Sequence, residues 1–335
     1  MAPKRIFLTG GSGYVGAVVA EQALAAGHSV RALSRSERSD AKLQALGAVP
    51  VRGDLTTLDV LRAESAAADA VIHLATAYVL GGPGTYDDVL PVDVAALDAL
   101  AEGLAGTDRP LVTTAGTLLA AADQAGGETD EASPEDASPL NTRGKHEKHA
   151  LALATEGVKS SGNGNGGGKG GTVRVSSVRL APWVYGRGGS GVGLFLNAAA
   201  KAGCATTVDG GTNRTTTVHV DDAARLYLLA AGAGERPAAA AGEVFNASGE
   251  TDVTVGDMFG AMARALGVPL RDVSFEQAAG EMGHMFASFV KAENRASGDK
   301  ARRVLGWEPR GLGVLDEIAK GSYAAVAESL RKQVA

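Results

Sequence analysis

The sequence predicts an α/β protein in which a doubly wound parallel sheet is joined to a smaller carboxyl-terminal lobe. Three observations lead to this prediction. A short apolar run at residues 4–8 enters a glycine-rich loop at residues 9–16. Apolar runs then alternate with helical patterns through the first half of the chain, which is typical of parallel strands covered by helices on both faces. Beyond Pro182 the predicted elements become shorter and more mixed.

The predicted elements follow from the spacing of apolar residues, which separates short apolar runs bounded by turn residues from helical repeats. In the first half the predicted strands are residues 4–8, 29–33, 49–52, 70–74, 110–114 and 173–180. The predicted helices are residues 15–26, 42–46, 58–67, 89–104 and 139–156. In the second half we expect helices at 194–202, 222–231, 255–266 and 297–305 and strands at 215–220 and 244–247.

These elements suggest a two-part organisation. Residues 1–180 form the nucleotide-binding domain, with contributions from about 205–250, and residues 181–335 form most of a substrate-binding lobe. Residues 159–172 are glycine-rich and of low complexity, so we predict a flexible surface insertion there. A small-molecule substrate would occupy the cleft outside the carboxyl ends of the strands.

Composition narrows the functional classes. The chain has 335 residues, of which 45% are hydrophobic and 21% charged, as in ordinary globular proteins. A formal net charge of -6 argues against nucleic acid as a partner. No signal-peptide core or membrane-length apolar stretch is recognisable, and the single cysteine, Cys204, cannot form an internal disulfide, so we expect a cytoplasmic protein without a membrane partner.

The glycine loop predicts a dinucleotide site. It has the form T-G-x-x-G-x-x-G and stands between a strand and a helix. The first glycine allows a tight turn, the second lets the backbone approach a pyrophosphate, and the third lets the helix pack closely. Amide groups at the helix start would bind the diphosphate. The loop residues assigned to the cofactor are Thr9, Gly10, Gly13, Tyr14, Val15 and Gly16.

The end of the second strand favours NADP(H). A carboxylate there would bind the ribose 2′-hydroxyl of NAD, but this chain has Ser34 and Arg35, and a guanidinium suits a 2′-phosphate. The alternative is that Arg35 and Arg38 are only solvated charges. Asp54 and Leu55 are expected to flank the adenine, although Asp54 would also serve as the N-cap of the next helix.

Several motifs in the same order carry a family resemblance. Together with the glycine loop they are residues 53–55, 71–75, 112–117, 178–186, 218–222 and 305–309. Over nearly its whole length the chain resembles the extended short-chain dehydrogenase/reductases of the epimerase/dehydratase and dihydroflavonol-reductase-like group, which have a Rossmann-type sheet. The resemblance implies that Leu74 and Ala75 also lie beside the cofactor.

The same resemblance implies a catalytic set with one departure. Relatives use a Ser or Thr after the fifth strand and a Tyr four residues before a Lys that also holds the cofactor ribose. Thr114 matches the first position and Lys145 the lysine, but Asn141 stands at the tyrosine position. Because an amide cannot transfer a proton near neutral pH, the usual acid is absent. The chain is therefore similar to atypical members of the family that lack the tyrosine.

Three hypotheses remain open from the residues. The protein reduces a carbonyl or imine of a small organic substrate with another proton source, for which Tyr78, Lys145 and Tyr185 are the candidates. Alternatively, an activated ketone or protonated imine needs less acid help, or the protein binds NADP(H) as a sensor or scaffold. The resemblance favours an oxidoreductase over a non-catalytic binder. An NADPH-dependent reductase is preferred to a sugar-nucleotide epimerase or dehydratase, because those reactions depend most on the missing tyrosine.

Two further expectations concern assembly and metals. In many relatives the helices matching residues 89–104 and 139–156 form a dimer face, so a homodimer is expected, although the same apolar residues would also serve an intramolecular core. The histidines have no metal-ligand spacing with carboxylates or cysteine, so no metal is predicted. We expect His73 to pack near the cofactor and His146 to lie on a helix surface.

Overall fold

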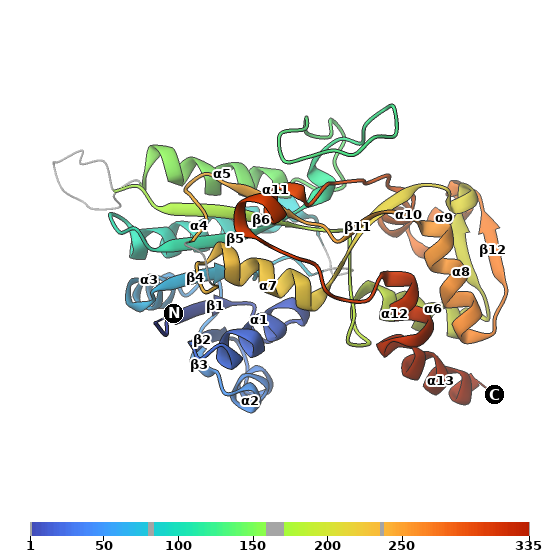
Figure 1. Ribbon diagram of the computed structural model, residues 1–335, viewed down its shortest axis with the longest axis horizontal. Coiled ribbons are helices and arrows are strands. Elements are labelled where there is room, and N and C mark those ends of the chain that lie inside the picture. Colours follow the sequence, from blue (N-terminus) through green and yellow to red (C-terminus); the bar gives the residue numbers. More distant parts are fainter. Residues whose placement is uncertain (1, 80–83, 159–170, 235–237, 335) are drawn as a thin grey trace.

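The computed structural model describes residues 2–79, 84–158, 171–234 and 238–334. The glycine-rich insertion predicted at residues 159–172 therefore lies almost wholly outside the described residues. Seven parallel strands form the central sheet in the order β10-β6-β5-β4-β1-β2-β3 (Figure 1). Their bounds are β1 (Arg5–Thr9), β2 (Ser29–Ser34), β3 (Val49–Arg52), β4 (Ala70–His73), β5 (Pro110–Gly116), β6 (Arg174–Leu180) and β10 (Val244–Ala247). The predicted doubly wound parallel sheet is confirmed.

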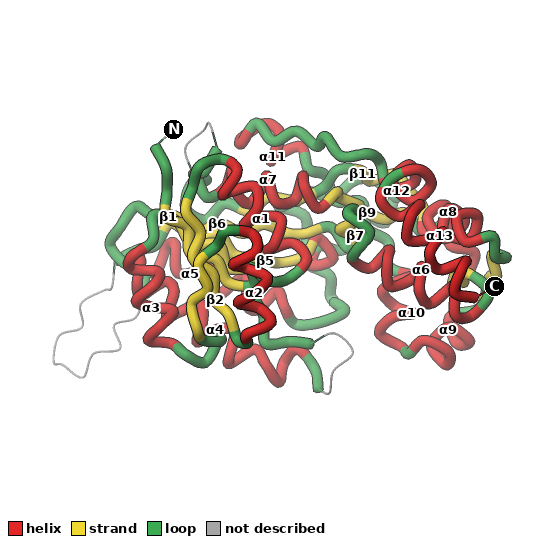
Figure 2. The backbone as a smooth tube through the Cα atoms, turned by 90° about the horizontal axis from the view of Figure 1, so that it is seen from below, coloured by secondary structure: helices red, strands yellow, loops and turns green. Residues whose placement is uncertain are grey.

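Helices cover both faces of this sheet (Figures 1 and 2). On one face lie α1 (Tyr14–Ala25), α2 (Glu37–Leu46) and α7 (Val220–Ala230), and on the other α3 (Leu58–Ala67), α4 (Tyr86–Leu104) and α5 (Arg143–Glu156). The pleat of β1 explains the division, because successive side chains of a strand point to opposite faces. Ile6 and Leu8 join the core beneath α1 and α7, whereas Phe7 joins the core beneath α3 and α4.

The strand order places the nucleotide crevice. The chain starts in the middle of the sheet at β1, runs outward through β2 to β3, and returns to the other side of β1 with β4. Such a reversal leaves a crevice at the carboxyl ends of the two central strands, where ligands bind in open α/β sheets. The glycine loop follows β1, and His73 ends β4, so both lie at this crevice.

The second lobe has its own core. It contains α6 (Ser190–Ala202), α8 (Val255–Leu266), α9 (Phe275–Met282), α10 (His284–Lys291), α12 (Val314–Lys320) and α13 (Ser322–Val334), with the parallel pair β8 (Ala205–Val208) and β12 (Leu270–Val273). The three-stranded sheet β11-β9-β7 comprises Glu250–Thr254, Arg214–His219 and Trp183–Tyr185. Helix α11 (Asp299–Leu305) returns to the seven-stranded sheet and packs against β10 and α7.

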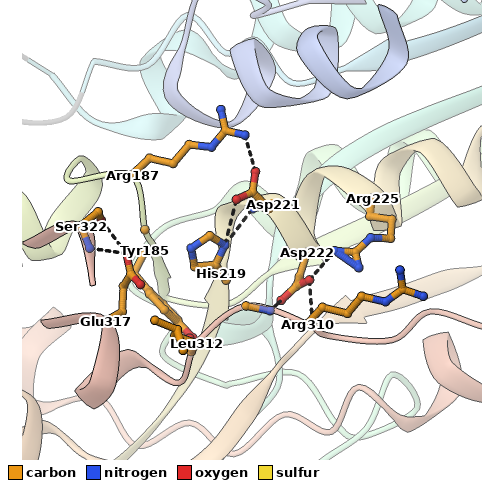
Figure 3. A network of polar contacts seen from close by, with 12 residues as sticks. Tyr185, Arg187, His219, Asp221, Asp222, Arg225, Arg310, Leu312, Glu317 and Ser322 are labelled. Carbon is orange, nitrogen blue, oxygen red and sulfur yellow. Dashed lines mark hydrogen bonds and ion pairs between the residues drawn. The ribbon is translucent and has the colours of Figure 1, made fainter. Parts of the chain in front are cut away.

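A polar network fixes the segment that joins α11 to α12 against α7 (Figure 3). The buried Asp222 carboxylate accepts hydrogen bonds from the Arg225 guanidinium and from the backbone amides of Arg310 and Gly311 at 2.7, 2.9 and 2.8 Å. Nearby, the Arg187 guanidinium bridges Glu21 of α1 and Asp221 of α7. The second lobe is thereby attached to the face of the sheet that carries α1.

Candidate functional site

The glycine loop after β1 forms a cradle that leaves the backbone at the start of α1 uncovered by side chains. Gly10 has φ of 74°, and Gly13 is the N-cap of α1 without a side-chain cap. A Cβ on Gly16 would lie 2.1 Å from the Gly10 carbonyl oxygen, so only glycine fits there. Within the described residues, the amides of Tyr14, Val15 and Gly16 have no hydrogen-bond acceptor. Free amides at a helix start are the donors that bind a phosphate group.

The first residue of the loop motif has a structural role. The Ala75 amide donates to the buried Thr9 hydroxyl at 3.2 Å, and the same oxygen lies 2.7 Å from Nδ1 of His73. A Cβ on Gly10 would approach the Ala75 nitrogen to 3.0 Å. Thr9 therefore fixes the end of β4, with Leu74 and Ala75, directly against the loop. The Tyr14 hydroxyl donates to the Gly186 carbonyl at 2.7 Å, so that side chain joins the loop to the second lobe.

The end of β2 presents an exposed guanidinium, that of Arg35, whose charge contributes to lowering the pKa of Asp54. Ser34 is buried and its hydroxyl bonds to the Ser36 carbonyl oxygen at 3.3 Å, whereas the exposed Arg35 makes no ion pair in the described ranges. The Asp54 carboxylate accepts hydrogen bonds from the hydroxyl and amide of Thr56, which lower the pKa of Asp54. The N-cap of α3 is Thr57, so the interpretation of Asp54 as that N-cap is wrong. Leu55 is buried beside it.

Thr114 lies at the carboxyl end of β5 with both hydrogen-bonding functions of its hydroxyl in use. The hydroxyl donates to the His73 carbonyl oxygen and accepts from the Tyr227 hydroxyl, each at 2.9 Å. Only 5% of the residue is exposed. Burial raises the pKa of Tyr227, with the Thr114 bond opposing that rise. The Thr114 hydrogen is thus directed to β4 rather than to open space.

Asn141 and Lys145 lie on the outside of the fold. Helix α5 begins at Arg143 rather than at residue 139, because the Asn141 side chain instead accepts a hydrogen bond from the Arg143 amide in a local turn. Lys145 is exposed, and its Nζ contacts Asp87 of α4 at 3.0 Å. No contact in the described part of the chain joins either residue to Thr114.

A buried polar cluster occupies the sheet-facing side of α5 instead. His73 and His146 are 1% and 4% exposed, and their ring centroids are 5.9 Å apart. The expectation of a surface His146 is therefore wrong. Burial lowers the pKa of His73 to about 3 and that of His146 to about 4, so both rings are neutral. Among the described residues, Nε2 of His73, both ring nitrogens of His146 and Nε of Arg143 have no partner.

The sequence contained the pattern that would have found this cluster. The inward residues of α5 are His146, Glu147, Ala150 and Leu153, with Arg143 partly buried one turn earlier. These positions repeat every three or four residues, which is the period of one helix face. Lys145 lies off that face. The family resemblance assigned the active-site cation to Lys145 from residue type. The position on the inward face of α5 instead favours Arg143.

Tyr78 lies beyond the carboxyl end of β4, where it contacts the second lobe. Its ring packs edge-on against Tyr86 with centroids 5.9 Å apart, and its hydroxyl lies 3.6 Å from Sδ of Met285 in α10. The Tyr86 hydroxyl donates to Asp93 at 3.1 Å, and burial raises the pKa of Tyr86 to about 12. By contrast, the Tyr185 hydroxyl is committed to the Leu312 carbonyl oxygen at 2.7 Å.

Other parts of the described chain give less evidence of a functional site. A cavity of about 340 Å³ lies beyond the carboxyl end of β10, at the sheet edge opposite β3, and is lined by residues 248–253 and 297–299 together with Glu128 and Arg302. Across the described ranges, no group of three or more His, Cys, Asp or Glu side chains is arranged to hold a metal ion. No described helix combines the length and apolarity needed to cross a membrane.

The parallel sheet, its switch point and the glycine cradle define a dinucleotide-binding protein of the extended short-chain dehydrogenase/reductase type. The chain belongs to the NAD dependent epimerase/dehydratase family, whose model matches residues 6–248. The family resemblance that the motifs predicted is confirmed. The family is described as NAD dependent, and structures with the same fold contain NAD, as in MoeE5, or NADPH, as in human SDR39U1.

Individual relatives and structures agree with the family. The chain is 32% identical over 321 residues to uncharacterized protein C2A9.02 of Schizosaccharomyces pombe, covering 95% of this chain and 99% of the relative. It is 26% identical over 288 residues to the 2-alkyl-3-oxoalkanoate reductase of Stenotrophomonas maltophilia, covering 82% and 80%. The structure of gox2253 superposes with a TM-score of 0.74 at 22% identity, covering 97% and 98%. Human epimerase family protein SDR39U1 with NADPH gives 0.67 at 19% identity, covering 94% and 99%.

Proposed function

We propose that this protein is an NADP(H)-dependent oxidoreductase that reduces a carbonyl or imine group of a small organic substrate. The observation that carries the cofactor choice is the pair Ser34 and Arg35 at the end of β2, because the strand does not end in the acidic residue that would bind a ribose 2′-hydroxyl. The free amides of Tyr14, Val15 and Gly16 would hold the diphosphate. When bound, NADPH supplies the hydride for the reduction.

Tyr78 is the proton donor that we propose. Its hydroxyl contacts only the thioether of Met285 among the described residues, and a thioether is a weak acceptor. The hydroxyl hydrogen therefore stays available to a substrate oxygen or nitrogen, unlike those of Tyr86 and Tyr185. Its position against α10 places it where the second lobe, which we propose as the substrate-binding lobe, meets the nucleotide domain.

A ketone is the substrate class that we propose to test first. One relative is named a 2-alkyl-3-oxoalkanoate reductase, and a ketoreductase of Stigmatella aurantiaca is 46% identical over 71 residues, or 21% of this chain. The structures solved with sugar nucleotides are about 20% identical and support the fold alone. Purified protein with NADPH and a panel of ketones, diketones and cyclic imines should oxidise the cofactor, followed by nicotinamide absorbance. No turnover of any ketone or imine would contradict reduction as the function.

Arg35→Ala should weaken NADPH binding by about 10- to 100-fold, because charge-assisted hydrogen bonds contribute about 1.5–3 kcal/mol each. NADH binding should stay unchanged. Dissociation constants for both cofactors can be measured by fluorescence titration. Lys42→Ala, which removes an exposed charge from α2, is the matched control. Tighter binding of NADH than NADPH by the wild-type protein would exclude the assignment to Arg35.

Tyr78→Phe should lower kcat by about 100-fold or more, because a positioned proton donor typically contributes a factor of about 100 to 10 000. NADPH affinity and melting temperature should remain those of the wild type, since the lost hydroxyl bonds only to Met285. Steady-state kinetics with the best ketone of the panel provides the measurement. An unchanged kcat would remove Tyr78 from the reaction.

The second candidate function is NADP(H) binding without turnover, as a sensor or scaffold. The observation that favours it is the commitment of the Thr114 hydroxyl to His73 and Tyr227, together with the exposed position of Asn141. NADPH binding without oxidation across the whole panel would support this candidate.

We also propose a cytoplasmic homodimer joined through α4 and α5. Sedimentation velocity measures the mass of the protein in solution and tests this assembly.

A further inference from the structure

Arg143 places a positive charge at the carboxyl edge of the sheet without a counter-ion. It is the first residue of α5, it is partly buried, and it forms no ion pair among the described residues. Its Nε is buried and has no hydrogen-bond partner within those residues. A buried polar atom is usually hydrogen-bonded, so the unpartnered Nε leaves the guanidinium available to an acceptor that binds at this site.

The surroundings of Arg143 come from four separate elements. His73 ends β4, Tyr86 starts α4, His146 lies one turn along α5, and Tyr227 belongs to α7. The Arg143 charge adds to burial in lowering the pKa of His73 and of His146, and it opposes the effect of burial on the pKa of Tyr86 and Tyr227. One guanidinium thus acts on groups from helices on both faces of the sheet.

Asp93, whose charge acts on both His146 and Tyr86, already has hydrogen-bond donors. The buried Asp93 carboxylate accepts hydrogen bonds from the Thr76 hydroxyl at 2.6 Å, the Ala77 amide at 2.7 Å and the Tyr86 hydroxyl at 3.1 Å. The two histidines are neutral, so each has one N–H to donate and no charge to offer. The cluster is consequently rich in donors and suits an oxygen acceptor.

We propose that Arg143 is the cationic catalytic residue of this site and that its guanidinium binds the carbonyl oxygen of the substrate. The inference rests on the proposed reductase function, and it gives the catalytic cation to Arg143 rather than to Lys145, with a role at the substrate oxygen rather than at the cofactor ribose. As hydride adds to the carbonyl carbon, the C=O π bond opens and its electron pair moves to oxygen. Arg143 stabilises that negative charge, and the Tyr78 hydroxyl then delivers the proton, which water replaces.

The rotation of α5 about its axis explains why Arg143, and not Lys145, faces the sheet. Glu147, one turn later on the same face, is tied to β6 by a bidentate ion pair with Arg179 and by a hydrogen bond from the Ser177 hydroxyl at 2.6 Å. This buried contact fixes the rotation of α5. With Glu147 inward, Arg143 also points to the sheet and Lys145 points to Asp87.

Arg143→Met should lower kcat/KM by about 100- to 1000-fold, the loss seen when one oxyanion donor is removed. Arg143→Lys should recover part of that loss, and ethylguanidine should partly restore Arg143→Ala. Lys148→Met, which removes an exposed charge from α5, is the matched control and should retain wild-type kinetics. A large loss in Lys145→Met with none in Arg143→Met would overturn the assignment.

A readout without turnover separates this inference from the proposed function. The probe is 4-nitrophenol, whose phenolate is a coloured oxyanion, added to protein saturated with NADP⁺. Wild-type protein should bind the phenolate and lower the apparent pKa of the bound probe, and Arg143→Met should do neither. An Arg143-dependent shift without turnover of any ketone supports the site and contradicts the reductase. Turnover unchanged in Arg143→Met, or no phenolate binding by wild-type protein, overturns the role of Arg143.

Discussion

Gly16→Ala should weaken NADPH binding by about 100-fold or more. The added Cβ would lie 2.1 Å from the Gly10 carbonyl oxygen, 2.7 Å from the carbonyl carbon and 2.9 Å from Cα of Gly11. All three are backbone atoms, so α1 must move away from the loop. That movement misaligns amides whose bonds to a charged diphosphate contribute about 1.5–3 kcal/mol each. Fluorescence titration with NADPH gives the dissociation constant.

Gly280→Ala is the matched control for this substitution. Gly280 lies within α9 and a Cβ there would meet no atom within 4 Å. Alanine at this position should leave NADPH binding unchanged and add about 0.5–1 kcal/mol of stability, because glycine is unfavourable inside helices. If Gly16→Ala bound NADPH within threefold of the wild-type protein, the glycine cradle would not be the diphosphate site.

Glu147→Gln should reduce the free energy of unfolding by about 3–5 kcal/mol, the usual cost of leaving a buried charge without its partner. The Glu147 and Arg179 side chains are 4% and 9% exposed, and their closest nitrogen and oxygen atoms are 2.7 Å apart. The variant leaves the Arg179 guanidinium in the core with a neutral amide. Urea unfolding followed by circular dichroism measures the change.

The exposed pair between Lys148 and Glu135 provides the comparison. It has the same nitrogen–oxygen distance of 2.7 Å, but its side chains are 65% and 47% exposed. Glu135→Gln should cost no more than about 1 kcal/mol, because water screens surface pairs and the ordered side chains lose entropy. Equal losses in the two variants would show that burial does not control the strength of the Glu147 contact.

The first half of the fold could be predicted because each element has a local pattern. Residues 49–52 and 58–67 were predicted with the bounds that β3 and α3 have. In the second half, α8 and β10 also match, but β8, β12, α9 and α10 were not predicted. Leu270–Val273, for example, has two adjacent polar residues between two apolar ones and therefore lacks the alternation typical of a strand. Its partner β8 lies some 65 residues earlier in the chain, so the pairing cannot be predicted from a local pattern.

By itself, the sequence determined the family, the parallel sheet and the glycine cradle, because T-G-x-x-G-x-x-G between a strand and a helix is a local signal. Only the tertiary structure decided which side chains gather beyond the carboxyl ends of the strands, at the site that we propose. The rotation of α5, fixed by Glu147 and Arg179, turns Lys145 outward and Arg143 toward His73 and Tyr227. The rotation of α5 cannot be predicted from the residue type at a motif position, because the rotation follows from packing against β6, a strand that comes later in the chain.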